Sequence, residues 1–184
     1  MPAPRQPVET GLSMADAQAA SAGSSPLFLP EAEFRAAQDL LFFAYRDFTN
    51  AADVILQELG LGRAHHRALH YIGGNPGIPV TELLAILRIT KQSLARVLSA
   101  LVEQGYVAQT QGRTDRRQRL LALTPAGLAL ERRLFERQRA CLAAAFHDAG
   151  AASVEGFRQV MRGIMDDAAR AYMDRAGAHR ARPA

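Results

Sequence analysis

The sequence predicts a mainly α-helical fold that contains one small β-hairpin. Apolar residues make up 48% of the 184 residues, enough for a buried core, and they recur every three or four residues over most of the chain. Alanine is abundant, which favours helix. One pair of short alternating runs flanks a polar tip, as in a hairpin. The length fits one domain with tails.

Several classes of protein are excluded. The first residues lack the apolar core of a signal peptide, and no stretch approaches a membrane span, so we expect a cytoplasmic protein. The single cysteine, Cys141, excludes an intrachain disulfide and a cysteine-based zinc site. No nucleophile elbow, phosphate-binding glycine loop or paired-carboxylate motif is present, so we expect neither an enzyme nor a cofactor.

The N-terminal part divides into a tail and a helix. Residues 1–29 are rich in Pro, Ala, Ser and Gly without periodicity, which predicts a disordered tail. An acidic helix follows over residues 30–60, with an apolar stripe that starts at Phe34 and Ala37. Asn50 suggests a break in this helix before Asp53.

A helix, a short helix and a third helix come next. The first spans residues 63–72 and stops at the glycine-rich segment 73–77; the short one spans 80–87. Thr90 can cap the third helix by accepting a hydrogen bond from a free first-turn N–H. Gly105 ends that helix, whose predicted buried face consists of Leu94, Val97, Leu98, Leu101 and Val102.

Two strands and two helices complete the pattern. Residues 106–111 and 118–123 read as strands around the tip 112–117, and Thr124 followed by Pro125 begins a helix that reaches about residue 148. After Gly150 one further helix is expected, then a basic tail over residues 175–184. This order predicts a winged helix-turn-helix over residues 61–124.

Positive charge gathers in the winged segment. Residues 88–119 hold seven cations and two anions, a net charge of +5 against +4 for the whole chain. A polar, cationic helix start beside a basic hairpin suits duplex DNA, with the helix in the major groove. Single-stranded substrates are less suited, because Tyr106 is the only aromatic residue here and stacking needs more. The residues expected to face base edges are Lys91, Gln92, Ser93, Ala95 and Arg96.

The hairpin tip supplies the second set of contacts. The Asp115 carboxylate, two residues before Arg117, can hold that guanidinium in a fixed fork for entry into the minor groove. The alternative is an ordinary surface ion pair. Arg113, Arg116 and Arg119 are expected to meet phosphates, so that about 6 neutralised phosphates would give a salt slope of about −5.

At these residues the chain resembles the MarR family of bacterial transcriptional regulators. The resemblance spans residues 31–172 and rests on VTELLAILRITKQSLARVLSALVEQGYV and on GRTDRRQRLLALTPAGLAL, which contains the wing D-x-R and L-T-x-x-G patterns. The stretches LLFFAYRDF and GRAHHRALHYI resemble an alphaproteobacterial, PetP-like subgroup. Lys91, Arg88, Pro79 and Ile86 depart from the family pattern.

The resemblance implies a homodimer that binds a pseudo-palindromic operator. Residues 30–60 and 125–174 would form the dimer, and a ligand pocket would lie where they meet the winged segment. By position, Gln92, Ser93, Ala95 and Arg96 would read bases, and Asp115 with Arg117 would form the wing clamp.

An effector pocket and two sensors are weighed from the residues. The expected pocket, for an anionic aromatic effector, consists of Phe42, Tyr45, Arg46 and His66; the alternative places the aromatics in a dimer core and makes Arg46 a surface partner. His66 and His70 have metal-ligand spacing, although with His65 they fit a pocket-lining or core role better. Cys141 sits on an apolar stripe, which favours an inert, buried thiol over a redox sensor.

The predicted function is a homodimeric repressor of transcription that a small molecule releases from DNA. The alternatives are an architectural or protein-interaction winged-helix module, a constitutive regulator with an empty pocket, and a redox-responsive regulator that uses Cys141.

Overall fold

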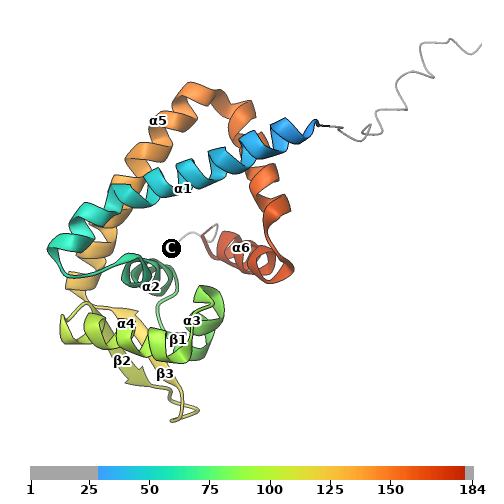
Figure 1. Cartoon of the computed structure of the whole chain (residues 1–184). Coiled ribbons are helices and arrows are strands. Elements are labelled where there is room, and N and C mark those ends of the chain that lie inside the picture. Colours follow the sequence, from blue (N-terminus) through green and yellow to red (C-terminus); the bar gives the residue numbers. More distant parts are fainter. Residues whose placement is uncertain (1–28, 181–184) are drawn as a thin grey trace, which may run out of the picture. The chain divides into compact units, whose positions relative to one another are not determined.

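The computed structural model describes residues 29–180 (Figure 1). The chain divides into two compact units, residues 1–42 and residues 43–184. In the first unit the described residues are the beginning of helix α1 (Glu31–Glu58); the remaining described elements lie in the second. The tail predicted for residues 1–29 falls, except for its last residue, outside the described part. Within the described part, no helix has the length and apolar character needed to cross a membrane.

The winged segment of the second unit contains three helices and three short strands (Figure 1). The strands form an antiparallel sheet in the order β1-β3-β2, which confirms the mainly α fold with a small β-wing. The unpredicted strand β1 pairs Ile78 with Leu121; its two residues are too few to show alternation. In chain order the elements are α2 (Arg63–Gly74), β1 (Ile78–Pro79), α3 (Val80–Leu87), α4 (Lys91–Glu103), β2 (Val107–Gln111) and β3 (Arg119–Leu123).

One apolar core holds these elements together. Each contributes side chains that are almost completely removed from water, and further core residues come from α1 (Ala52 and Leu56) and from α5 (Pro125–Ile164), which supplies Leu130 and Leu134. Burying a leucine of this kind contributes about 1.5–3 kcal/mol, so the core fixes where α4 and the hairpin sit. The largest fully buried side chains are Leu56, Leu69, Ile72, Leu83, Leu94, Leu101, Leu121 and Leu134.

The break predicted at Asn50 is wrong, because α1 is continuous from Glu31 to Glu58. Asn and Thr are unfavourable inside a helix when their side chains compete with it for backbone hydrogen bonds. Here the Asn50 side chain is engaged elsewhere: its Oδ1 accepts from Arg63 at 2.7 Å. The Thr49 hydroxyl donates back to the Tyr45 carbonyl at 2.9 Å without ending the helix.

The C-terminal helices differ from the prediction in two places. Gly150, at φ 78° and ψ 165°, interrupts α5 as expected, although helix resumes directly after it. The single helix predicted beyond Gly150 is in fact divided, because Asp166 caps a separate helix α6 (Asp167–Arg180). The continuing apolar pattern hid this cap. Helix α6 also runs through residues 175–180, where a loose tail was predicted.

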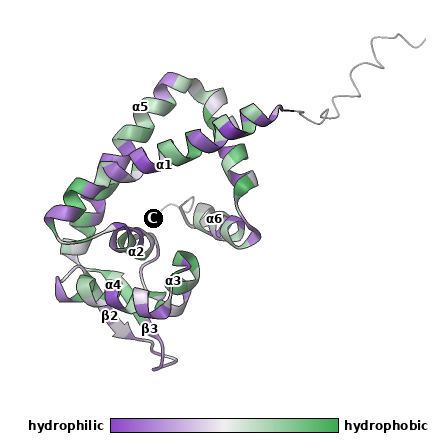
Figure 2. Cartoon of the chain, in the orientation of Figure 1, coloured by the Kyte–Doolittle hydropathy of each residue, from purple (hydrophilic) through white to green (hydrophobic). Residues whose placement is uncertain are grey.

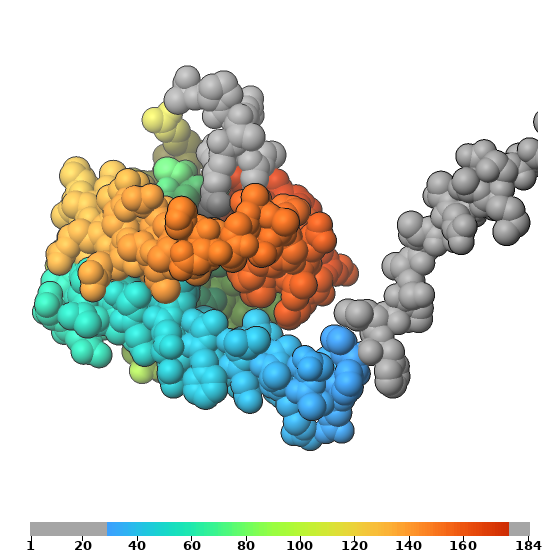
Figure 3. All heavy atoms as spheres, turned by 90° about the horizontal axis from the view of Figure 1, so that it is seen from above, coloured from blue at the N-terminus to red at the C-terminus, as the bar shows by residue number. Residues whose placement is uncertain are grey.

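Some apolar residues predicted to be buried are exposed in the single chain. Val102 on α4 and Leu128 on α5 retain 39% and 53% of their accessible surface. Cys141 is exposed as well, which corrects its placement in a buried stripe. Helical periodicity identifies an apolar face but not what covers it. Figure 2 shows apolar residues interleaved with polar ones along α5, whose surface is seen in Figure 3.

Candidate nucleic-acid interface

The start of α4 presents the residues predicted to read base edges. Thr90 is the N-cap, as predicted: its Oγ1 accepts from the Ser93 N–H at 3.1 Å and so fixes the first turn. Leu94, Val97 and Leu98 are buried, which turns the opposite face of the helix outward. On that face Ser93 is half-buried, and the exposed residues are Lys91, Gln92, Ala95 and Arg96.

The hairpin tip is fixed through the backbone. Asp115 Oδ1 accepts from the Arg117 N–H at 2.9 Å, and the Gln118 N–H donates to the Asp115 carbonyl at 3.1 Å. The guanidinium fork predicted between Asp115 and Arg117 is therefore replaced by a turn, and Asp115 forms no ion pair within residues 29–180. An aspartate side chain reaches a backbone N–H two residues on with little entropy cost, whereas a guanidinium must be ordered along its whole stem.

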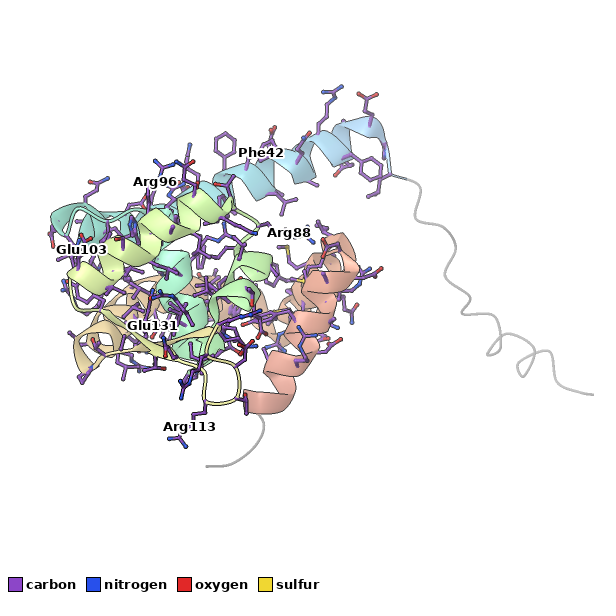
Figure 4. All side chains as sticks on the ribbon, turned by 90° about the horizontal axis from the view of Figure 1, so that it is seen from below. Phe42, Arg88, Arg96, Glu103, Arg113 and Glu131 are labelled. Carbon is purple, nitrogen blue, oxygen red and sulfur yellow. The ribbon has the colours of Figure 1, made fainter. Side chains whose placement is uncertain are left out.

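The tip arginines are free of carboxylate partners in the described structure. Arg113, Arg116 and Arg117 are exposed, and Figure 4 shows Arg113 projecting from the hairpin while Arg96 projects from α4. Arg119 differs, because its Nη1 donates to Gln109 Oε1 across the sheet at 3.4 Å. Many arginines elsewhere pair with carboxylates, as Arg63 does with Asp53 at 2.7 Å. Unpaired, exposed cations are the groups that phosphates can engage without first breaking an ion pair.

Two grooves run beside this surface, and sequence reasoning found neither. One, of about 400 Å³, lies between α3, α4 and the sheet and includes Lys91, Ala95 and Arg119. The other brings Thr81 of α3 close to Arg117 of the tip. Pro79 provides no side-chain cap for α3, so the first N–H groups of that helix carry partial positive charge beside the wing.

The turn between α3 and α4 has an unusual backbone. Arg88 adopts the left-handed conformation at φ 51° and ψ 44°, which costs a non-glycine residue about 1–2 kcal/mol. Two contacts hold it: Arg67 Nη2 donates to the Leu87 carbonyl at 3.2 Å, and Arg88 Nη2 pairs with Asp166 Oδ2 at 2.5 Å. The Ala169 N–H and the Arg88 guanidinium keep the pKa of Asp166 below its usual value.

A cavity of about 380 Å³ contains one of the four predicted pocket residues. His66 and His70 line it from α2 together with Phe48 of α1 and Glu131 and Phe135 of α5. Burial, and then the charge of His70, lowers the pKa of His66, which favours its neutral imidazole. His70 Nδ1 lies 3.7 Å from Glu131 Oε1. The part of the cavity formed by α5 could have been inferred from the sequence, because Phe135, Leu142 and Phe146 recur there at helical spacing.

The other three predicted pocket residues do not line this cavity. Phe42 belongs to the first compact unit and is exposed there. Tyr45 is also exposed, and Arg46 is bound to Asp47 at 2.8 Å with its guanidinium 4.8 Å from the centre of the Phe43 ring. The aromatic stripe on α1 predicted an apolar face but did not show which turn of α1 contributes to the cavity; that turn contains Phe48.

The remaining sensor candidates are placed as follows. His65 Nδ1 accepts from the Gly62 N–H at 3.0 Å, which ties it to the start of α2. Burial lowers the pKa of His65. Among residues 29–180 no group of three His, Cys, Asp or Glu side chains could hold a metal ion. Cys141 lines a mostly apolar cavity with Phe48, Phe146 and Phe157.

Comparison with known proteins adds to this geometry. Residues 59–118, from the residue after α1 to the end of the wing tip, match the sequence profile of the MarR family. The HTH-type transcriptional regulator PetP of Rhodobacter capsulatus is 47% identical over 153 residues, covering 83% of this chain and 92% of that protein.

Solved structures show the same fold. The crystal structure of MarR aligns with a TM-score of 0.58 and 25% identity over 73% of this chain and 98% of that one. A mutant MarR from E. coli in complex with operator DNA aligns with a TM-score of 0.59 and 21% identity over 77% and 100%. These similarities confirm the resemblance drawn from the helix and wing motifs. The chain belongs to the MarR family of DNA-binding transcriptional regulators.

Proposed function

We propose that the chain represses transcription as a homodimer on a pseudo-palindromic operator and leaves DNA when a small molecule binds. The DNA contact is inferred from two groups of exposed cations, one at the start of α4 and one at the hairpin tip, which have no carboxylate partners among the described residues. We call these two groups the prongs. A dimer would place two pairs of prongs on successive major grooves, about one helical turn apart.

Within each prong the residue types suggest separate roles. Lys91, Gln92, Ser93, Ala95 and Arg96 would contact base edges, because arginine matches guanine and glutamine matches adenine. At the tip, Arg113, Arg116 and Arg117 would engage phosphates or the minor groove, with Asp115 shaping the turn that presents them. In this division, residues 61–124 form the DNA-binding segment.

The apolar surface outside that segment supports dimerisation. Phe157, Val160 and Ile164 follow one another at three- and four-residue spacing on α5 and remain 47–63% exposed in the single chain. Phe43 and Tyr45 on α1 are similarly exposed. Contiguous exposed apolar side chains of this size mark interaction surfaces in soluble proteins. We therefore assign residues 30–60 and 125–174 to the dimer.

The cavity beside His66 is the site we propose for the effector. Its apolar walls, Phe48, Phe135 and Phe146, suit an aromatic body, and Arg139 and the two histidines supply polar groups at its edge. An anionic aromatic molecule matches this combination. Because α1, α2 and α5 all contribute to the cavity, a bound molecule would shift α2, which packs against α4.

The test is selection of genomic DNA fragments by the purified full-length protein, followed by footprinting and a small-molecule release screen. We expect a short protected palindrome and release by a small aromatic anion. Uniform coating of every fragment without sequence preference would contradict the proposal and would favour an architectural role.

A further inference from the structure

Helix α6 reaches the helix-turn-helix through one carboxylate that has two partners. Asp166 Oδ1 accepts from the Ala169 N–H at 2.8 Å and caps α6, while Oδ2 of the same group pairs with Arg88 Nη2 at 2.5 Å. Arg88 is the left-handed residue between α3 and α4. The start of α6 is thus tied to the turn that precedes α4, the helix proposed to read bases and here called the recognition helix. Figure 4 shows Arg88 beside α6.

A second contact lies further along α6. The Asn75 side-chain amide donates to Tyr172 Oη at 3.0 Å and to the Tyr71 carbonyl at 2.8 Å. The Tyr71 and Tyr172 rings meet edge to face with their centres 5.6 Å apart. Asn75 follows α2, so α6 is joined both to the first helix of the motif and to its central turn.

The turn depends on such contacts. The left-handed conformation of Arg88 is unfavourable for an arginine, and it persists only if the surroundings stabilise it. Arg67 holds the carbonyl of the preceding residue, Leu87, and Asp166 holds the Arg88 side chain. Two residues later, Thr90 begins α4. A change in the position of Asp166 would therefore be transmitted to the orientation of α4.

We propose that α6 acts as a brace on the DNA-binding segment and that Asp166 is a positioning residue for the recognition helix, acting through Arg88. This inference rests on the proposed sequence-specific binding to an operator. The brace is formed by α6 of the same chain. The effect should be moderate, because the Arg88 and Asp166 side chains are 66% and 46% exposed. An exposed ion pair contributes little, so its loss should change affinity by at most about fivefold.

The decisive variant is Asp166→Asn in the full-length protein. Asparagine still caps α6, because it is as good an N-cap as aspartate, but it cannot form the ion pair. The matched control is Asp167→Asn, which removes the same charge from the next residue, where the carboxylate pairs with Arg170 instead. Arg88→Asn and the double variant complete a cycle; asparagine tolerates the left-handed backbone.

Binding is measured by fluorescence anisotropy on a duplex selected by the protein and on a scrambled duplex. We expect Asp166→Asn to weaken binding to the selected duplex about two- to fivefold, with the scrambled duplex and Asp167→Asn unchanged. The double variant should match Arg88→Asn. Tighter binding of Asp166→Asn to both duplexes would overturn the proposal, since Asp166 would then merely compete with DNA for a cation. Equal behaviour of the two aspartate variants would also overturn it.

Amide hydrogen exchange without DNA separates this inference from the proposed function. If α6 braces the turn, Asp166→Asn should speed exchange over residues 87–94 and leave α6 itself unchanged. Unchanged exchange over that turn would overturn the brace even if an operator is found. Faster exchange would support the brace even if no operator is found.

Discussion

Gly127 shows why the L-T-x-x-G motif of this chain ends in glycine. It is the glycine of the L-T-x-x-G pattern, in the first turn of α5. Its N–H donates to Thr124 Oγ1 at 3.1 Å, and a Cβ built on it would lie 2.0 Å from the Tyr106 carbonyl oxygen. That oxygen accepts from the Thr124 N–H at 3.0 Å, so it cannot move aside freely.

We therefore expect Gly127→Ala to lower the free energy of unfolding by at least about 2–3 kcal/mol, measured by denaturant titration. The control is Gly163→Ala in the same helix, where an added Cβ would meet no atom within 4 Å. That change should raise stability by about 0.5–1 kcal/mol, because alanine favours helix. Equal effects of the two substitutions would contradict the packing argument.

Asp115 allows a second prediction, about the shape of the wing tip. Its Oδ1 fixes the turn by accepting from the Arg117 N–H, a role that the amide oxygen of asparagine can take over. Asp115→Asn should therefore keep or slightly increase affinity for duplex DNA, because it also removes a negative charge near phosphates. Asp115→Ala removes the same charge but also loses the hydrogen bond, so it should bind more weakly than Asp115→Asn by roughly 0.5–1.5 kcal/mol.

Both proteins would be titrated with the same duplex at one salt concentration. A guanidinium fork gives the opposite expectation, since it needs the carboxylate charge. If asparagine weakens binding as much as alanine does, the tip is organised by the ion pair and not by the turn.

At the scale of elements, local signals were sufficient where a side chain caps its own helix. Thr90 and Thr124 accept from the N–H three residues on, as their positions before apolar repeats predicted. The break at Asp166 was missed, because the apolar pattern continues through Met165 and Ala168 although the chain does not remain helical. Strand β1 was missed since its pairing with Leu121 depends on a residue far along the chain.

The candidate site divides in the same way. The exposed face of α4 followed from which positions are apolar, and the tip cations from the hairpin pattern. The sequence could not show whether the Asp115 carboxylate would bind the Arg117 guanidinium or the Arg117 backbone N–H, because both groups lie within its reach. The cavity beside His66 required knowing that α5 passes α2, a long-range contact with no local signature.

The two prongs have different expected roles, and one pair of variants separates them. Arg96→Ala on α4 should reduce discrimination between selected and scrambled duplexes by about 1–3 kcal/mol per base contact. Arg113→Ala at the tip should weaken binding to both duplexes and reduce the slope of log K against log salt by about 1. Both side chains are exposed and project from separate elements (Figure 4).

Titrations at several salt concentrations measure both effects, and Arg133→Ala on α5 controls for the loss of one exposed cation elsewhere. If Arg96→Ala and Arg113→Ala change affinity and specificity alike, the division between base contacts and phosphate contacts is wrong.

At the scale of the whole molecule, charge and apolar surface occupy different segments. Among the described residues, six cations without carboxylate partners lie on α4 and the hairpin, although Arg133 on α5 also lacks one, and all of the large exposed apolar side chains except Leu29 and Val102 lie on α1, α5 and α6. Exposed apolar area of this kind costs free energy in water unless a partner covers it. A second copy would cover it and double the DNA contacts at the same time, so oligomerisation and operator affinity should change together.

Val160 tests this link, because it lies in the middle of the exposed stripe of α5 and is 63% exposed in the single chain. Val160→Glu would place a carboxylate in an interface that excludes water. A penalty on the order of 3 kcal/mol would weaken the dimer at least about 100-fold. Gln159→Glu, one residue earlier and also exposed, adds the same charge outside the stripe. Sedimentation velocity at micromolar concentration should show a monomer for Val160→Glu alone, and that variant should also lose its preference for the selected duplex. A dimer that survives Val160→Glu would place the subunit contact elsewhere on the molecule.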